Sequence, residues 1–289
     1  MTPVPAFGHS GVHPRIPFPI PKPQSQIRNS HPPNPKRPPC RIHPTPPKLS
    51  PLRPPISHLP SPDSSLQTPN SPVMKPKAVI FDMDGVLTDS EPLINEAAVA
   101  MFRDRGVNVA PDDFLPFVGT GENRYIGGVA EKHGVTLDIE QAKHRTYEIY
   151  LGLVPAKLHA FPGAVEKARE FRHAGFRLAV ASSADLIKIQ ANLDRIGLPV
   201  SWWESVVSAE DAVHKKPAPD LFLAAARKLG VEPDQCVVIE DAVNGVQAAL
   251  AAGMKCIAVA QTFPAERLSA AHRVCPTLAS IRLQDLVFP

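Results

Sequence analysis

Residues Ala78–Phe81 have the sequence AVIF and run directly into Asp82, Met83, Asp84 and Gly85. A short, continuous apolar run of this kind is typical of a β-strand that is buried on both faces. Strands buried on both faces belong mainly to parallel sheets, which helices cover from either side. The two aspartates follow the strand, so we expect them at its carboxyl end.

Four similar apolar runs follow along the chain, at residues 178–181, 206–207, 236–239 and 256–259. Helical patterns lie between them, at residues 164–174, 186–196, 220–229 and 243–252. Strands and helices that alternate at this spacing predict an α/β fold, a Rossmann-like parallel sheet with helices on both faces.

One long interval, residues 82–160, breaks this alternation. It carries helical patterns near residues 93–105, 112–118, 124–133 and 139–150. Such an interval is too long for a simple crossover, so we interpret it as an inserted helical cap over the carboxyl edge of the sheet. The sequence therefore predicts a core of residues 75–91 and 160–289 with a helical cap at residues 92–159.

The amino-terminal segment, residues 1–74, differs in composition from the rest. It holds 22 of the 35 prolines, and its eight Lys/Arg against one acid, Asp63, give it a net charge of +7. Proline at this density prevents helices and central strands, so we expect a disordered or removed tail. Three interpretations remain open: a transit peptide, a proline-rich interaction segment, or a leader that precedes a translation start at Met74.

Several classes of protein are disfavoured by composition. No apolar run approaches the roughly 20 residues of a membrane helix, so we expect no membrane insertion. Basic charge without interleaved aromatic residues gives no support for nucleic-acid binding. The four cysteines include no C-x-x-C pair. Neither a disulfide framework nor a zinc site is indicated, which favours a reducing compartment.

Polar residues follow four of the expected strands: Asp82 and Asp84, Ser182 and Ser183, Lys215 and Lys216, and Glu240 and Asp241. Because ligands of open parallel sheets bind outside the carboxyl ends of the strands, we expect these side chains to face one crevice. Carboxylates gathered this densely repel one another and need a cation. Carboxylate oxygens without histidine or cysteine favour Mg2+. Lys216 and Ser182, with the backbone amides at Ser183, would bind a phosphate group opposite the metal.

Each of these residues also has an ordinary structural explanation. Asp82 and Asp84 could lie in a solvated turn, Ser182 could cap a helix, and Glu240 with Asp241 could complement a helix dipole. Taken together, these explanations require four coincidences at four successive strand ends. Glycines at 119, 121, 127 and 128 do not form a phosphate loop, because no strand precedes them. We interpret them as helix boundaries and sites of close packing.

Four segments, residues 81–90, 181–183, 216–220 and 240–242, resemble in order and spacing the four motifs of the haloacid dehalogenase (HAD) superfamily. The resemblance extends over residues 76–289 and is strongest to the β-phosphoglucomutase-like branch, which carries a helical cap. It implies that Asp82 is the nucleophile that forms an aspartyl phosphate and that Asp84 is the general acid and base. It also implies a Mg2+ cofactor held by Asp82, the backbone carbonyl of Asp84 and Asp241, with help from Glu240.

Departures from the family pattern distinguish its branches. Carbon–halogen and carbon–phosphorus cleaving members lack the second aspartate, which is present here as Asp84. Mutases carry a histidine four residues after the position of Ser90, where this chain has Ile94, and their cap arginine is not clearly matched. We therefore expect a monomeric phosphatase that acts on a small phosphorylated metabolite. The alternatives are a sugar-phosphate mutase and a regulatory module with little turnover.

The cap polar residues that could select the substrate are Glu122, Asn123, Arg124, Lys132 and His133. Residues 118–122, 127–130 and 236–246 resemble the HAD domain of a multidomain plant chloroplast protein. This second resemblance favours the transit-peptide interpretation and a chloroplast location. A translation start at Met74 would instead imply the cytoplasm.

Overall fold

A computed structural model describes residues 76–288. The predicted α/β class is confirmed, because a six-stranded, all-parallel sheet has the order β3-β2-β1-β4-β5-β6. The strands are β1 (Ala78–Phe81), β2 (Arg177–Ala181), β3 (Ser205–Val207), β4 (Cys236–Glu240), β5 (Lys255–Val259) and β6 (Arg273–Cys275). The order reverses at β1, which pairs with both β2 and β4, and this is the position at which such sheets bind ligands.

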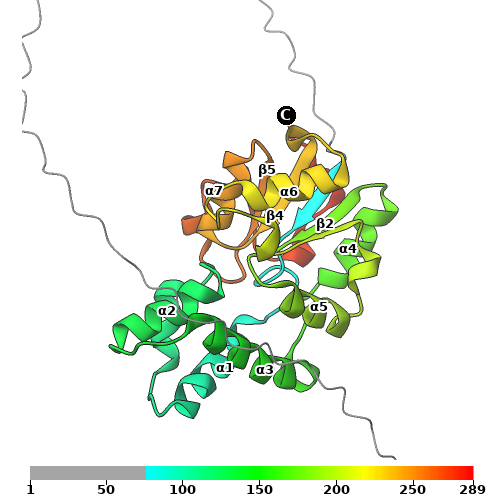
Figure 1. The fold of residues 1–289 in the computed structure, drawn as a ribbon. Helices are drawn as coiled ribbons and strands as arrows, with labels where there is room; N and C mark the ends of the chain where they lie inside the picture. Colours follow the sequence, from blue (N-terminus) through cyan, green and yellow to red (C-terminus); the bar gives the residue numbers. More distant parts are fainter. Residues whose placement is uncertain (1–75, 289) are drawn as a thin grey trace, which may run out of the picture. The chain divides into compact units, whose positions relative to one another are not determined.

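Helices pack against both faces of the sheet, as the continuous apolar strands require. The helices beside the sheet are α4 (Ala164–His173), α5 (Leu186–Arg195), α6 (Asp220–Leu229) and α7 (Val243–Ala251). Alternate strand residues separate the two cores: Phe81 packs with residues of α4 and α5, whereas Ile80 packs with residues of α6 and α7. Figure 1 shows these two pairs of helices on opposite sides of the strands.

A third core lies among the helices inserted between β1 and α4. These elements are α1 (Glu91–Asp104), the 3-10 helix η1 (Pro111–Phe117), α2 (Glu122–Lys132) and α3 (Ile139–Lys157). Its buried residues run from Leu93 to Leu158, all within the segment predicted as the cap. Figure 1 shows these helices gathered beyond one end of the sheet.

Three elements differ from the sequence-based expectation. Residues 111–117 form a 3-10 helix that contains Pro116, which has no N–H to continue an α-helical ladder. Helix α3 extends seven residues past Tyr150 to Lys157, because Val154 is still buried in the cap core and Pro155 lies only in its last turn. The short edge strand β6 was missed because Arg273–Cys275 is too short for a recognisable apolar run.

The amino-terminal predictions concern residues outside the described range. This applies to the tail, to its boundary at residue 74 and to Cys40. The three other cysteines, Cys236, Cys256 and Cys275, are free and buried. Within residues 76–288, no helix combines the length and apolar character needed to cross a membrane.

Candidate active site

Backbone hydrogen bonds hold the strand ends that carry the predicted site residues. The Asp82 N–H donates to the Ile239 carbonyl at 2.9 Å, and the Ser182 N–H donates to the Val207 carbonyl at 3.0 Å. The chain then leaves β1 in a tight loop closed by the Gly85 N–H, which donates to the Thr88 carbonyl at 3.0 Å. The polar side chains therefore project from one ordered edge of the sheet.

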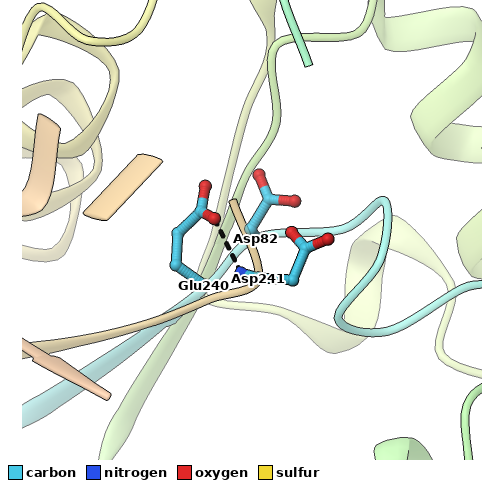
Figure 2. A group of neighbouring side chains, drawn as sticks. All are labelled: Asp82, Glu240 and Asp241. Carbon is cyan, nitrogen blue, oxygen red and sulfur yellow. Dashed lines mark hydrogen bonds between the residues drawn. The ribbon is translucent and has the colours of Figure 1, made fainter. Parts of the chain in front are cut away.

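Asp82, Glu240 and Asp241 meet at this edge, with one carboxylate oxygen of each lying within 4.8 Å of the others. All three are buried, at 5%, 1% and 4% exposure respectively. Figure 2 shows their carboxylates gathered around one position, with Glu240 bonded to the backbone of Asp241. Glu240 Oε2 accepts from the N–H groups of Asp241 and Ala242 at 2.7 and 2.6 Å, which fixes its orientation.

Lys216 is the ammonium group of this cluster. Its Nζ donates to Asp82 Oδ1 at 2.5 Å and to Glu240 Oε1 at 2.7 Å. Burial alone would lower the pKa of Lys216, but the adjacent carboxylates of Asp82 and Glu240 raise it above its ordinary value. The lysine therefore stays charged and holds the Asp82 carboxylate in one orientation.

One ammonium does not balance three carboxylates. Burial raises the pKa of Asp82 to about 7, opposed by Lys216 and reinforced by Glu240 and Asp84. Burial, together with Glu240 and Asp82, also raises the pKa of Asp241 well above its ordinary value. Carboxylates that are costly to ionise in this arrangement would be stabilised by a divalent cation, and hard oxygen donors suit Mg2+. The residues present therefore fit the predicted metal.

Two glycines permit the carboxylates to approach the backbone this closely. A Cβ atom on Gly85, whose φ is +84°, would come within 1.9 Å of Asp241 Oδ2. A Cβ atom on Gly245 would come within 1.6 Å of Glu240 Oε1. Side chains at either position would displace a carboxylate, so both glycines are part of how the site is built.

The Asp84 carboxylate does not join this three-acid cluster. It accepts a hydrogen bond from Ser90 Oγ, forms an ion pair of 3.1 Å with Lys188 Nζ, and lies 3.4 Å from Ser182 Oγ. The structure thus brings the two predicted catalytic aspartates into one pocket but gives them different partners. Asp82 pairs with Lys216, and Asp84 pairs with Lys188.

The phosphate-binding residues predicted from sequence also lie in this pocket. Ser182, Ser183 and Lys216 all line it. Ser182 Oγ accepts from the Ala184 N–H at 3.1 Å, while the N-cap of α5 is Asp185, so Ser182 is not the helix cap. The hydroxyl and the ammonium therefore face the same space as the acids.

Of the five cap residues proposed to contact substrate, Glu122 lines the pocket. The other four are paired on the surface of the cap: Asn123 with Glu140, Arg124 with Glu131, and Lys132 and His133 with Asp113.

The cap glycines have two different surroundings. Gly119 and Gly121 line the pocket, and a Cβ on Gly128 would meet the ring of Phe117 at 2.3 Å. The close-packing interpretation therefore holds for Gly128.

Lys188 is a buried residue of the pocket that sequence reasoning missed. It is 2% exposed and lies in α5, with its Nζ 3.1 Å from Asp84 Oδ1 and 3.4 Å from Glu122 Oε1. Its signal in the sequence was weak, because one lysine in a helical pattern usually faces solvent. Glu91, at the start of α1, and Asn244, at the start of α7, also line the pocket and were not singled out.

The sequence pattern of the haloacid dehalogenase-like hydrolase family matches residues 76–253. This chain belongs to that family. It is 52% identical over 176 residues to the protein SUPPRESSOR OF QUENCHING 1, chloroplastic, of Arabidopsis thaliana, covering 60% of this chain and 17% of that protein. It is 32% identical over 197 residues to hexitol phosphatase A of Escherichia coli, covering 66% of this chain and 87% of the relative.

The fold also agrees with solved structures. The structure of CbbY from Rhodobacter sphaeroides in complex with phosphate has a TM-score of 0.67 and 26% identity, and the match covers 73% of this chain and 99% of that one. The chain nevertheless spans less than half the length of the first curated relatives it matches. The match covers 17%, 45% and 42% of the lengths of three of these relatives.

Proposed function

We propose that this protein is a Mg2+-dependent phosphatase that hydrolyses a small phosphomonoester through an aspartyl phosphate on Asp82. The observation that carries the proposal is one pocket that holds a lysine-paired acid, Asp82, a second acid, Asp84, two residues further on, and a cluster of acids suited to a metal. The names of several relatives support it: putative phosphatase YhcW, fructose-1-phosphate phosphatase YqaB and hexitol phosphatase A.

In the first displacement, an Asp82 carboxylate oxygen attacks phosphorus, and the bond between phosphorus and the leaving oxygen breaks. Asp84 gives a proton to that leaving oxygen. The Lys216 ammonium and the Ser182 hydroxyl stabilise negative charge on the transferred group, since positioning and electrostatics supply most of the catalysis in phosphoryl transfer.

In the second displacement, Asp84 takes a proton from water while the water oxygen attacks phosphorus. The bond between phosphorus and the Asp82 oxygen then breaks, which releases phosphate and restores both acids. Bound Mg2+, held by Asp82, Asp241 and the Asp84 carbonyl with Glu240 nearby, would offset the repulsion between the nucleophile and the phosphate.

The lining of the pocket favours hydrolysis over phosphoryl transfer between sugar positions. Ile94, at the position where mutases carry a histidine, lines the pocket with an apolar side chain. Among residues 76–288, no arginine lines the pocket to hold the second phosphate of a bisphosphate intermediate. A mutase would need such a group to keep its intermediate bound.

The cellular location is part of this proposal. We place the protein in the chloroplast, with residues 1–74 as a transit peptide, on the basis of the tail composition and the chloroplastic relative. A fusion of the full chain to a fluorescent protein in plant cells tests this. Diffuse cytoplasmic fluorescence would contradict the proposed location.

Phosphate release by the full 289-residue chain tests the activity. The substrates are sugar phosphates, polyol phosphates, nucleotides and an aryl phosphate, each with and without Mg2+. We expect release that requires the metal and falls by at least about a thousandfold in Asp82→Asn, because the nucleophile is lost. Release that survives the substitution would contradict the assignment of Asp82.

A further inference from the structure

The part of the pocket that the cap helices line is acidic. Beyond the phosphate end, its lining includes the carboxylates of Glu91 and Glu122 from the cap helices, together with apolar and aromatic side chains such as Ile94 and Tyr125. A leaving group held there meets two carboxylates.

The two ammonium groups that line the pocket are both already paired. Lys216 donates to Asp82 and Glu240 at 2.5 and 2.7 Å. Lys188 lies 3.1 Å from Asp84 and 3.4 Å from Glu122. An anionic leaving group drawn to Lys188 would have to share this ammonium with Asp84 and Glu122 and would lie beside both buried carboxylates, which repel it.

The two cap carboxylates still have capacity to accept hydrogen bonds. An ionised carboxylate offers about four acceptor sites, whereas Glu122 has one lysine partner at 3.4 Å. Within the described part of the chain, no side chain or N–H group is hydrogen-bonded to the Glu91 carboxylate. Burial raises the pKa of both groups, to about 7 for Glu91, with Lys188 opposing and nearby acids reinforcing the effect. Hydroxyl groups of a ligand would stabilise the ionised form of these two acids, whereas an anion beside them would destabilise that form further.

We propose that the leaving group of the substrate is an uncharged, hydroxyl-rich chain whose hydroxyls donate to Glu91 and Glu122. The same carboxylates exclude substrates that carry a second phosphate or a carboxylate on that chain. This inference rests on the proposed phosphatase activity and deepens it.

One further cation, Lys215, lies near Gly121 at the edge of the pocket. It is exposed, so solvent and salt weaken any attraction it offers to an anionic substrate.

Matched pairs of phosphomonoesters test the inference, because the members of each pair differ at the far end of the leaving group. The pairs are sorbitol 6-phosphate with 6-phosphogluconate, glycerol 3-phosphate with 3-phosphoglycerate, and fructose 1-phosphate with fructose 1,6-bisphosphate. We expect the full chain to favour the uncharged member of each pair by about tenfold or more in kcat/KM, as expected when a buried site is matched to one polarity of substrate.

Two variants assign this preference to the cap acids. In Glu122→Gln and Glu91→Gln we expect the ratio within each pair to fall by about threefold or more. The ratio is the readout because a general loss of activity affects both members of a pair. Glu131→Gln is the matched control, since Glu131 lies in the same helix as Glu122 and is exposed. Its ratio should equal that of the unmodified protein.

Failure of this inference can be distinguished from failure of the proposed function. If both members of each pair are hydrolysed equally well, or if the preference persists unchanged in both glutamate variants, the substrate inference is wrong and the phosphatase stands. If no compound in the panel is hydrolysed, or if Asp82→Asn retains full activity, the proposed function fails and the inference fails with it. A melting curve for each variant shows that it is folded.

Discussion

The hydroxyl of Tyr150, in α3, donates a hydrogen bond of 2.7 Å to Oδ1 of Asn192, in α5. Both residues are fully buried, and they connect the inserted helices to a helix that packs on the sheet. Asn192 also donates to Thr88 Oγ1 at 3.4 Å, in the loop that follows Asp82 and Asp84. One asparagine therefore contacts both the inserted helices and the active-site loop.

Replacing Tyr150 with phenylalanine should destabilise the protein, because it leaves the Asn192 oxygen buried without its donor. We expect a loss of about 1–3 kcal/mol in the free energy of unfolding, measured by denaturant titration. Asn192→Ala should cost more on its own but much less when added to Tyr150→Phe, since the two residues share one bond. Strictly additive effects would show that the bond contributes little.

Replacing Gly85 with alanine should disrupt the metal cluster. The new methyl group would meet Asp241 Oδ2 at 1.9 Å, and the positive φ of +84° adds strain. Gly134→Ala is the matched control, because Gly134 also has a positive φ, +64°, but nothing lies within 4 Å of the added atom. The control should lose only the conformational cost of about 1–2 kcal/mol.

We expect Gly85→Ala to lose more stability than this control and to lose phosphate release as well. Thermal melting and activity assays on the two variants measure both effects. Equal behaviour of the two variants would show that the active-site loop can move away from Asp241 without consequence.

Mg2+ should raise the melting temperature of the full chain by several degrees, because the cation binds a cluster of acids that exists only in the folded state. Asp241→Asn should melt no lower than the unmodified protein without metal, since it removes a buried carboxylate whose pKa is raised by burial and by Glu240. Its response to Mg2+ should be largely lost. Asp112→Asn, at an exposed position, should keep the full response. A normal Mg2+ shift in Asp241→Asn would remove Asp241 from the ligand set.

Glu91 gives the metal-free protein a pH-dependent stability. Burial raises the pKa of Glu91 to about 7, opposed by Lys188, so the folded state holds this proton more tightly than the unfolded state does. Its contribution to stability is therefore fully present below the ordinary glutamate pKa and is lost as the pH rises through about 7. Glu91→Gln should flatten the decline in melting temperature between about pH 5 and pH 8, relative to the unmodified chain. Parallel curves for the two proteins would contradict this assignment.

Much of the architecture could be predicted from the sequence. The apolar run Ala78–Phe81 identified the central strand, and the alternation of strands and helices identified the sheet. Strand-end position also grouped Asp82, Lys216 and Asp241 in one pocket, because parallel strands present their carboxyl ends at one edge. Two local expectations failed. Strand β6 was not predicted because it is too short to show an apolar pattern, and residues 111–117 form a 3-10 helix that contains Pro116.

The contacts that shape the substrate end of the pocket were beyond sequence reasoning. Glu122 was one of five polar cap residues that looked equivalent, and Lys188 looked like a surface lysine. They are 66 positions apart in the chain, and only the packing of α2 near α5 brings their charges to 3.4 Å.

The candidate catalytic residues could be located from the amino-acid sequence alone, because we expect such acids directly after buried strands and periodicity locates those strands. The packing of the folded chain was needed to show which lysine pairs with which acid and which polar cap residue lines the pocket. Strand and helix periods are local properties of the chain. The pairing of buried charges instead depends on how separate elements pack, and no local period records that.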